Sequence, residues 1–180
     1  MICNSQSSAV AGPVLVIDTT TDYIDYIYRQ YPGQAVFVTD RDRRRTAVEP
    51  APDNRYEILV GMEDPASVPE SVRRHLDSYR IRAAGIACFD CEAMLTASYV
   101  ARELELPYPS AEAVLASRSK FISKRLWQDA GLDCPAVAQI ESPVEAAAFC
   151  IKHGKVILKP LCGSGLPVYC APASRWCAGK

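Results

Sequence analysis

The segment KPLCGSG combines a lysine, Lys159, with three small residues, Gly163, Ser164 and Gly165. Glycine lets backbone N–H groups approach an oxyanion closely, and a lysine ammonium can rest on a phosphate as a point charge. The lysine directly follows the apolar run 156–158, which is typical of a short strand. These residues could therefore hold the phosphates of a nucleotide, although an ordinary surface turn would use the same glycines.

A second candidate for chemistry is the pair Cys88 and Cys91 in the motif CFDC. A zinc site usually takes four ligands from two such pairs, and the chain has no second CxxC motif and only two histidines, His75 and His153. A metal or redox protein remains the alternative for this motif. We expect Cys88 to be buried and unreactive at the end of a strand, and Cys91 to begin a helix.

Acidic residues follow three apolar runs, at Asp18, Asp40 and Asp90, and the basic run RDRRR follows the second of them at 41–45. Ligands of parallel sheets bind beyond the carboxyl ends of the strands, so these positions could contact a ligand. Helix capping and turn formation explain the same aspartates. We interpret the three aspartates as caps and turn residues and the basic run as a solvated loop.

The elements that would position these residues alternate between strands and helices over residues 12–108. Continuous apolar runs predict buried parallel strands, and the segments between them have helical spacing. The turn IDTTTDY after the first strand contains no glycine, so the dinucleotide-binding fingerprint is absent. The sequence predicts a small doubly wound α/β domain, with strands at 14–17, 35–38, 56–60 and 85–89 and helices at 66–80 and 91–105.

A different pattern of elements follows the segment LPYP at 106–109. Ser110 can cap a short helix at 111–117, and a basic helix begins near Lys120 and ends at Gly131. The segment SPVE is a capping box with proline at the first helical position. It predicts a helix that ends at Gly154, preceded by a strand at 136–140 and followed by one at 156–158.

Three segments of this second part, taken in order, resemble the ATP-grasp family. They read SRSKFISKRLWQDAGLDCPAVAQI, SPVEAAAFCIKHG and KVILKPLCGSG. The family has a basic helix with an Arg-x-Lys-like start, a Gly-Leu-x-x-Pro turn, a strand, a helix, a strand ending in Lys-Pro and a Gly/Ser-rich loop. Each motif is short, and their order carries the resemblance. Residues 12–108 likewise look like the small α/β domain that precedes an ATP-grasp module.

The resemblance implies a fold class and a division of the chain. The fold would be α/β, a small doubly wound parallel-sheet domain followed by the beginning of an α+β ATP-grasp subdomain. Residues 1–11 would form a flexible tail and 12–108 a Rossmann-like pre-ATP-grasp domain. Residues 109–165 would form the first part of the nucleotide-binding domain, and 166–180 an atypical tail.

The resemblance also implies a function and a set of nucleotide-binding residues. The intact family uses ATP and Mg²⁺ to convert a small carboxylate to an acyl-phosphate, which an amine or a thiol then attacks. Lys120 and Lys159 would contact the nucleotide, and Gly163, Ser164 and Gly165 would lie over its phosphates. Taken alone, Lys120 would also fit a solvated helix lysine. The resemblance assigns no catalytic and no metal-binding residue in this chain.

The sequence departs from the family pattern at Leu166. The stretch LPVYCAPASRWCAGK contains Pro167 and Pro172, which interrupt strand pairing, and predicts no β-hairpin after the glycine loop. The half of the family that carries the adenine pocket and the acidic metal ligands does not follow. We therefore expect the front portion of an ATP-dependent ligase, inactive by itself and weak in binding ATP. The alternative is a non-enzymatic α/β module that binds a small ligand or a partner subunit.

Composition and charge limit the classes of protein to which this chain could belong. Hydrophobic residues make up 49% of the chain, enough for a sizeable core, and the net charge of −1 argues against a general nucleic-acid binder. Residues 1–117 carry 11 basic and 17 acidic residues, whereas residues 118–180 carry 9 and 4. The basic part contains the glycine loop, which suits a polyphosphate. No apolar run is long enough for a membrane span and no signal peptide is recognised, so we expect a cytoplasmic protein.

Overall fold

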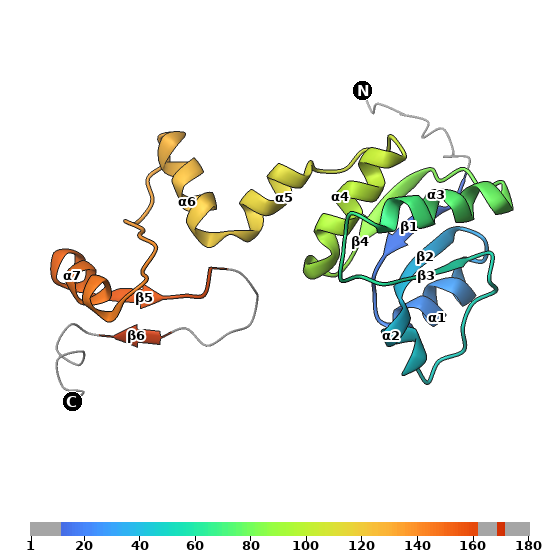
Figure 1. Cartoon of the computed structure of the whole chain (residues 1–180), viewed down its shortest axis with the longest axis horizontal. Coiled ribbons are helices and arrows are strands. Elements are labelled where there is room, and N and C mark those ends of the chain that lie inside the picture. Colours follow the sequence, from blue (N-terminus) through green and yellow to red (C-terminus); the bar gives the residue numbers. More distant parts are fainter. Residues whose placement is uncertain (1–11, 162–168, 172–180) are drawn as a thin grey trace, which may run out of the picture. The chain divides into compact units, whose positions relative to one another are not determined.

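The computed structural model describes residues 12–161 and 169–171, which form two compact units that divide between Val114 and Leu115 (Figure 1). The division falls inside helix α5 (Ala111–Arg118). We call described residues 12–114 the α/β unit and described residues 115–161 and 169–171 the second unit. Within these ranges, every helix is too short or too polar to cross a membrane.

The α/β unit is built on a four-stranded, fully parallel sheet in the order β3-β2-β1-β4. Its register places Val16 of the inner strand β1 beside Phe37 of β2 and Ala87 of β4. The continuous apolar runs in the sequence account for these strands, because a parallel sheet covered on both faces buries every side chain of an inner strand. The strands are β1 (Val14–Ile17), β2 (Ala35–Asp40), β3 (Glu57–Val60) and β4 (Gly85–Cys88).

Helices cover both faces of this sheet (Figure 1). On one face, Ile24 of α1 (Thr21–Gln30) packs against Val16 and Phe37. On the other face, helices α3 (Val68–Tyr79) and α4 (Met94–Glu103) cover alternate side chains of the same strands. The predicted doubly wound α/β fold class is therefore confirmed.

The prediction that all four strands are buried is wrong for β4, and also for Val14 of β1 and Leu59 of β3, which are 37% and 43% exposed. Each residue of β4 is only partly buried, and Phe89, which was predicted to end the strand, is 66% exposed. Both β4 and β3 are edge strands with a neighbouring strand on one side only, but β3 is in contact with α2 and α3 and keeps three of its four residues buried. An edge position depends on strand order, which the apolar run 85–89 cannot reveal.

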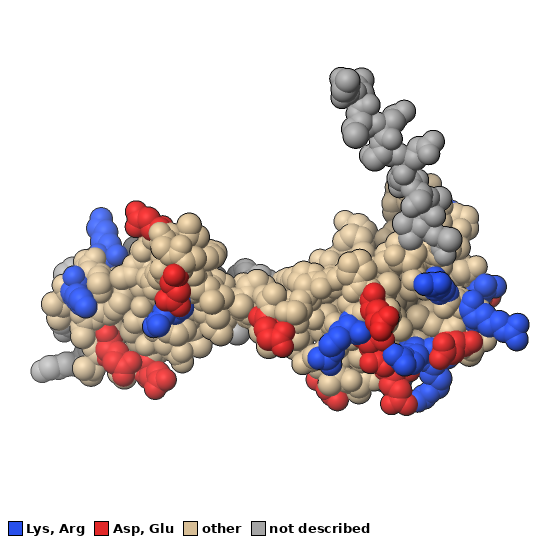
Figure 2. Space-filling model, turned by 90° about the horizontal axis from the view of Figure 1, so that it is seen from above, with Lys and Arg blue, Asp and Glu red and all other residues tan. Residues whose placement is uncertain are grey.

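Acidic and basic side chains lie side by side on the face of the α/β unit that Figure 2 shows. Arg73 of α3 lies 2.7 Å from a carboxylate oxygen of Glu103, which ends α4. Arg74 and Glu70 pair within α3 at one helical turn. Such exposed pairs contribute about 0–1 kcal/mol each and keep the surface solvated.

The second unit contains helices α6 (Lys120–Asp129) and α7 (Pro143–His153) and the short strands β5 (Val156–Leu158) and β6 (Tyr169–Ala171). Both predicted helix starts are confirmed, because Ser119 and Ser142 accept hydrogen bonds from backbone N–H groups three residues later. Both helices end at glycines with positive φ, Gly131 at 74° and Gly154 at 78°.

Two predictions for the second unit are wrong. Residues 136–140 form neither strand nor helix, because the described residues provide no strand beside them. Conversely, β6 pairs antiparallel with β5, whereas the sequence predicted no hairpin after the glycine loop. The strand lies between Pro167 and Pro172 in the sequence, so the three residues that pair all retain their backbone N–H groups.

Candidate functional site

The two lysines predicted to bind a nucleotide both belong to the second unit. Lys159 directly follows β5 and is exposed. Lys120 is the first residue of α6, and its backbone N–H donates a hydrogen bond of 3.3 Å to the carbonyl oxygen of Leu161. The structure thus places the start of α6 next to the segment that leads from β5 toward the glycine loop.

This arrangement has the chemistry of an anion site, because the amino end of a helix carries a partial positive charge and Lys120 and Lys159 add two more cations. The predicted loop residues Gly163, Ser164 and Gly165 lie outside the described residues. Their role over the phosphates stays a prediction, as do the roles of the two lysines.

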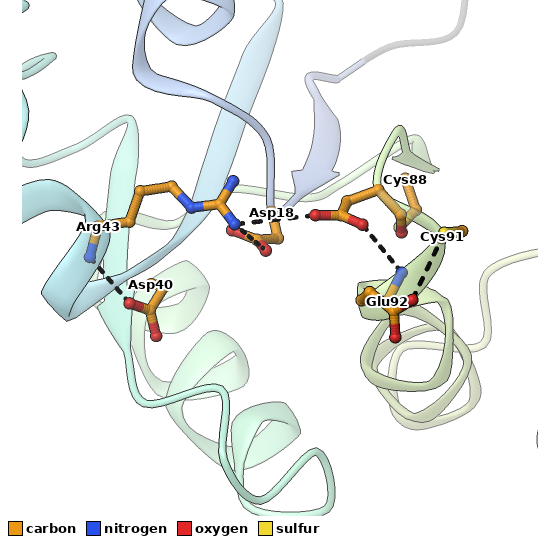
Figure 3. Close-up of polar contacts among 7 residues, drawn as sticks. Asp18, Asp40, Arg43, Cys88, Cys91 and Glu92 are labelled. Atoms are coloured by element: carbon orange, nitrogen blue, oxygen red, sulfur yellow. Dashed lines mark hydrogen bonds and ion pairs between the residues drawn. The ribbon is translucent and has the colours of Figure 1, made fainter. Parts of the chain in front are cut away.

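A second cluster of functional groups lies in the α/β unit, at the carboxyl ends of its strands (Figure 3). Asp18 follows β1, Asp40 is the last residue of β2, and Asp90 follows β4. Arg43 reaches this edge from the short helix α2 (Arg41–Arg45). The chain runs from β1 to β2 and β3 on one side, and the crossover after β3 returns to place β4 on the other side of β1. The cluster therefore lies at the topological switch point where ligands of open α/β sheets bind.

Arg43 joins the acidic groups of this cluster. Its Nη2 atom lies 3.1 Å from Oδ2 of Asp18 and 3.8 Å from Oδ2 of Asp90. Asp40 accepts a 2.9 Å hydrogen bond from the backbone N–H of Arg43, and Asp90 accepts one of the same length from that of Glu92. The capping roles predicted for Asp40 and Asp90 are therefore confirmed.

The interpretation of residues 41–45 as a solvated loop is wrong, because they form helix α2, and Arg43 and Arg44 are in ion pairs with acidic residues outside the helix. Arg44 donates to Oε1 of Glu57 in β3, which also accepts a 2.8 Å hydrogen bond from Oγ1 of Thr39. The side chains of Arg44 and Glu57 are only 10% and 5% exposed. This buried pair fixes α2 against the sheet and so positions Arg43 at the switch point.

Asp18 caps no helix and lies in the bend directly after β1, which agrees with the turn role also predicted for the three aspartates. Its backbone has a positive φ of 42°, the residue is 6% exposed, and its Oδ1 atom is buried without a hydrogen-bond partner. Burial raises the pKa of this carboxyl, and the charges of Asp90 and Asp40 add to the rise. The guanidinium of Arg43 and a hydrogen bond from the backbone of Asp40 lower the pKa. No sequence pattern predicts the environment of this oxygen, which depends on how the chain turns after β1.

Cys88 lies close to the same cluster (Figure 3). Its thiol donates a 3.1 Å hydrogen bond to the carbonyl oxygen of Asp90, and burial raises its pKa above 9.0. Cys88, on the edge strand β4, is half-buried rather than fully buried as predicted, whereas Cys91 is exposed. In the part of the chain that the structure describes, no three His, Cys, Asp or Glu residues are grouped to hold a metal ion.

Comparison with known proteins identifies a fold. No family model matches the sequence, and no curated protein matches it. Among solved structures, the chain is similar to the crystal structure of an L-amino acid ligase from Bacillus licheniformis, with a TM-score of 0.56 and 16% sequence identity. The match covers 89% of this chain and 39% of the ligase chain. This α/β chain thus shares its fold with less than half the length of a ligase.

Proposed function

We propose that this chain is the N-terminal portion of an ATP-dependent ligase of the ATP-grasp type. The observation that carries the proposal is the likeness to an L-amino acid ligase, which extends over 89% of this chain and so over more than the α/β unit. The order of the motifs in residues 118–165 supports the same family independently of the fold. The reaction would join a carboxylate to an amine or a thiol through an acyl-phosphate.

In this proposal the second unit holds the phosphates of ATP. Lys159 follows a strand, and Lys120 begins a helix whose first N–H group contacts Leu161, so both lysines flank the approach to Gly163, Ser164 and Gly165. Bound ATP would supply the phosphoryl group that activates the carboxylate. The lysines would neutralise phosphate charge, and the loop would add backbone N–H donors.

We further propose that this chain alone does not complete the reaction. The match covers 39% of the ligase that it resembles in fold, and the described residues contain no group of three His, Cys, Asp or Glu that could hold a metal ion. The second unit also exposes large apolar side chains, with Trp127 49%, Val144 78% and Ile151 81% exposed. An enzyme that binds ATP between two lobes would cover such surface and exclude water from the phosphates.

Photo-crosslinking with an azido analogue of ATP tests the location of the site. We expect the labelled peptides to come from the second unit, and we expect an excess of unlabelled ATP to reduce this labelling. A parallel assay measures ADP release over a panel of carboxylates and amines, and we expect none. Labelling confined to the α/β unit would overturn the location, and carboxylate-dependent ADP release would show that the chain is a complete enzyme.

The alternative function is a non-enzymatic α/β module that binds a small ligand. The observation that favours it is the cluster of Asp18, Arg43 and Asp90 at the carboxyl ends of the strands, where ligands of open α/β sheets bind. Binding of a small molecule in the α/β unit, without any effect of ATP on the second unit, would support this alternative.

A further inference from the structure

The α/β unit has a cavity at the amino ends of its strands, on the edge of the sheet opposite to the switch point. The cavity has a volume of about 300 Å³, and the residues that line it come from the segments before all four strands. Pro13 precedes β1, Gly33 precedes β2, Tyr56 precedes β3 and Arg82 precedes β4. Small-molecule sites have volumes of about 300–1,000 Å³, so this cavity suits a ligand at the small end of that range.

Three arginines line this cavity, Arg55, Arg80 and Arg82, and no acidic residue is among the described residues that line it. All three are exposed, and none forms an ion pair with a described acidic residue. Arg43 and Arg73 of the same unit, by contrast, pair with carboxylates. Residues 1–117 carry 17 acidic and only 11 basic residues, so their composition does not favour a group of cations without acidic partners.

Balancing the charge at a helix end does not account for all three arginines. Arg80 directly follows α3, whose carboxyl end carries about half a negative charge. That partial charge is smaller than the charge of one guanidinium, and Arg55 lies before β3 and follows no helix. Asp53 accepts a 2.8 Å hydrogen bond from the backbone N–H of Arg55, and its carboxylate does not line the cavity. The cavity therefore keeps a net positive charge.

The backbone around the cavity is fixed by contacts within the unit. The N–H group of Ile81 donates a 2.8 Å hydrogen bond to a carbonyl oxygen of α3, and that of Ala84 donates one of 2.9 Å to Pro13. A Cβ atom on Gly12 would overlap the carbonyl oxygen of Arg82, so glycine is needed where these two segments meet. The segments that line the cavity are thus held together without a ligand.

We propose that this cavity binds a small phosphorylated molecule. Guanidinium groups present paired N–H donors that match phosphate oxygens, and more than one of them is needed to balance a phosphate dianion. The ring of Tyr56, with the guanidinium of Arg55 5.8 Å from its centroid, offers an apolar surface to the organic part of the ester. A nucleic acid would extend beyond the cavity and meet the acidic surface of this unit. The site belongs to the α/β unit, whereas the proposed ATP site belongs to the second unit, and neither depends on the other.

Titration of the full chain with glycerol 3-phosphate at constant ionic strength, followed by NMR, tests this proposal. Glycerol lacks the phosphate, acetate lacks the second negative charge, and inorganic phosphate lacks the organic part. We expect saturable shifts of the backbone amides of residues 55–56 and 80–82 with glycerol 3-phosphate, weaker binding of inorganic phosphate, and no saturable shifts with glycerol or acetate. Lys159→Ala, which removes a lysine of the proposed ATP site, should leave these shifts unchanged.

Two variants and a matched control complete the test. Arg80→Gln and Arg82→Gln should each weaken the binding of glycerol 3-phosphate by about threefold to tenfold, because each removes a charge-assisted hydrogen bond that water partly screens. Arg41→Gln should bind as the original chain does, since Arg41 is also exposed but follows β2 at the opposite edge of the sheet.

Three results would overturn the proposal. The first is the absence of saturable shifts with glycerol 3-phosphate, or binding of inorganic phosphate or acetate that is equally tight. The second is undiminished binding by both Arg80→Gln and Arg82→Gln. The third is binding of a single-stranded oligonucleotide at these amides without binding of glycerol 3-phosphate, which would indicate a nucleic-acid surface instead.

Discussion

Arg43 and Asp18 form an ion pair across the carboxyl edge of the parallel sheet, with 3.1 Å between Nη2 and Oδ2. The pair joins helix α2 to the end of β1, and it leaves the second carboxylate oxygen of Asp18 buried without a partner. One arginine thus pairs with a buried carboxylate and joins α2 to the end of β1.

The stability of the chain should depend on the ionisation of Asp18. Burial raises the pKa of this carboxyl above 3.8, so the protonated form stabilises the fold below pH 3.8 and that contribution is lost as the pH rises through the raised pKa. Asp18→Asn stays neutral throughout. The free energy of unfolding of this variant, minus that of the original chain, should therefore increase with pH in this window and then level off.

Urea denaturation at a series of pH values measures this difference. Asp42→Asn on the exposed side of α2 serves as the control and should show no comparable increase. If the difference in free energy of unfolding between Asp18→Asn and the original chain decreases as the pH rises, the effect of Arg43 on the pKa of Asp18 outweighs the effect of burial.

Among the ion pairs of the described residues, the buried pair of Arg44 and Glu57 should contribute most to the free energy of unfolding. Arg44→Ala leaves the carboxylate of Glu57 buried with only Thr39 as a partner, and we expect it to lower the free energy of unfolding by about 3–5 kcal/mol. Arg45→Ala, on the same helix but 76% exposed, should change it by less than about 1 kcal/mol.

The double variant Arg44→Ala, Glu57→Ala should lose less stability than the sum of the two single variants, because neither charge is then left alone. Simple additivity would contradict a direct coupling between the two side chains.

The two thiols of the CFDC motif should differ in reactivity. Cys88 is half-buried, donates a hydrogen bond and has a raised pKa, so little thiolate forms at neutral pH. Cys91 is exposed and provides an internal comparison three residues away. Brief labelling with iodoacetamide followed by peptide sequencing should find Cys91 modified before Cys88. Labelling of Cys88 first would contradict this assignment.

The cap of helix α7 should contribute to the second unit. Ser142 accepts a hydrogen bond from the backbone N–H of Glu145, whose carboxylate in turn accepts one from the N–H of Glu141. Ser142→Ala should destabilise α7 by about 1 kcal/mol, seen as faster hydrogen exchange in residues 143–153. Ser142→Asp, which restores an acceptor, should recover the protection. Unchanged exchange in Ser142→Ala would show that the cap contributes nothing.

Much of the α/β unit could be predicted from the sequence, because its elements are defined by local patterns. The runs that became β1 and β2 are continuously apolar, and both cores that they enter are buried, with Leu15 and Phe37 fully inaccessible. The partial burial of β4 could not be predicted, because it depends on the strand order and on which helices are in contact with each edge strand.

The switch-point cluster could be predicted only in part. Asp40 and Asp90 cap the elements that follow them, and capping depends on neighbouring residues alone. The pairing of Arg43 with Asp18 joins residues that are 25 positions apart, and it requires α2 to be fixed against the sheet by Arg44. No pattern within a single element contains that information.

The central claim, that the second unit is the front of an ATP-binding domain, is tested most directly by titration of the chain with ATP-Mg. NMR of the original chain, Lys159→Ala and Lys155→Ala provides the comparison, because Lys155 is also an exposed lysine four residues away. Our account predicts weak, saturable binding, with a free energy near or weaker than about −4 kcal/mol, that is lost in Lys159→Ala and kept in Lys155→Ala. Equal binding by the original chain and Lys159→Ala would contradict the account.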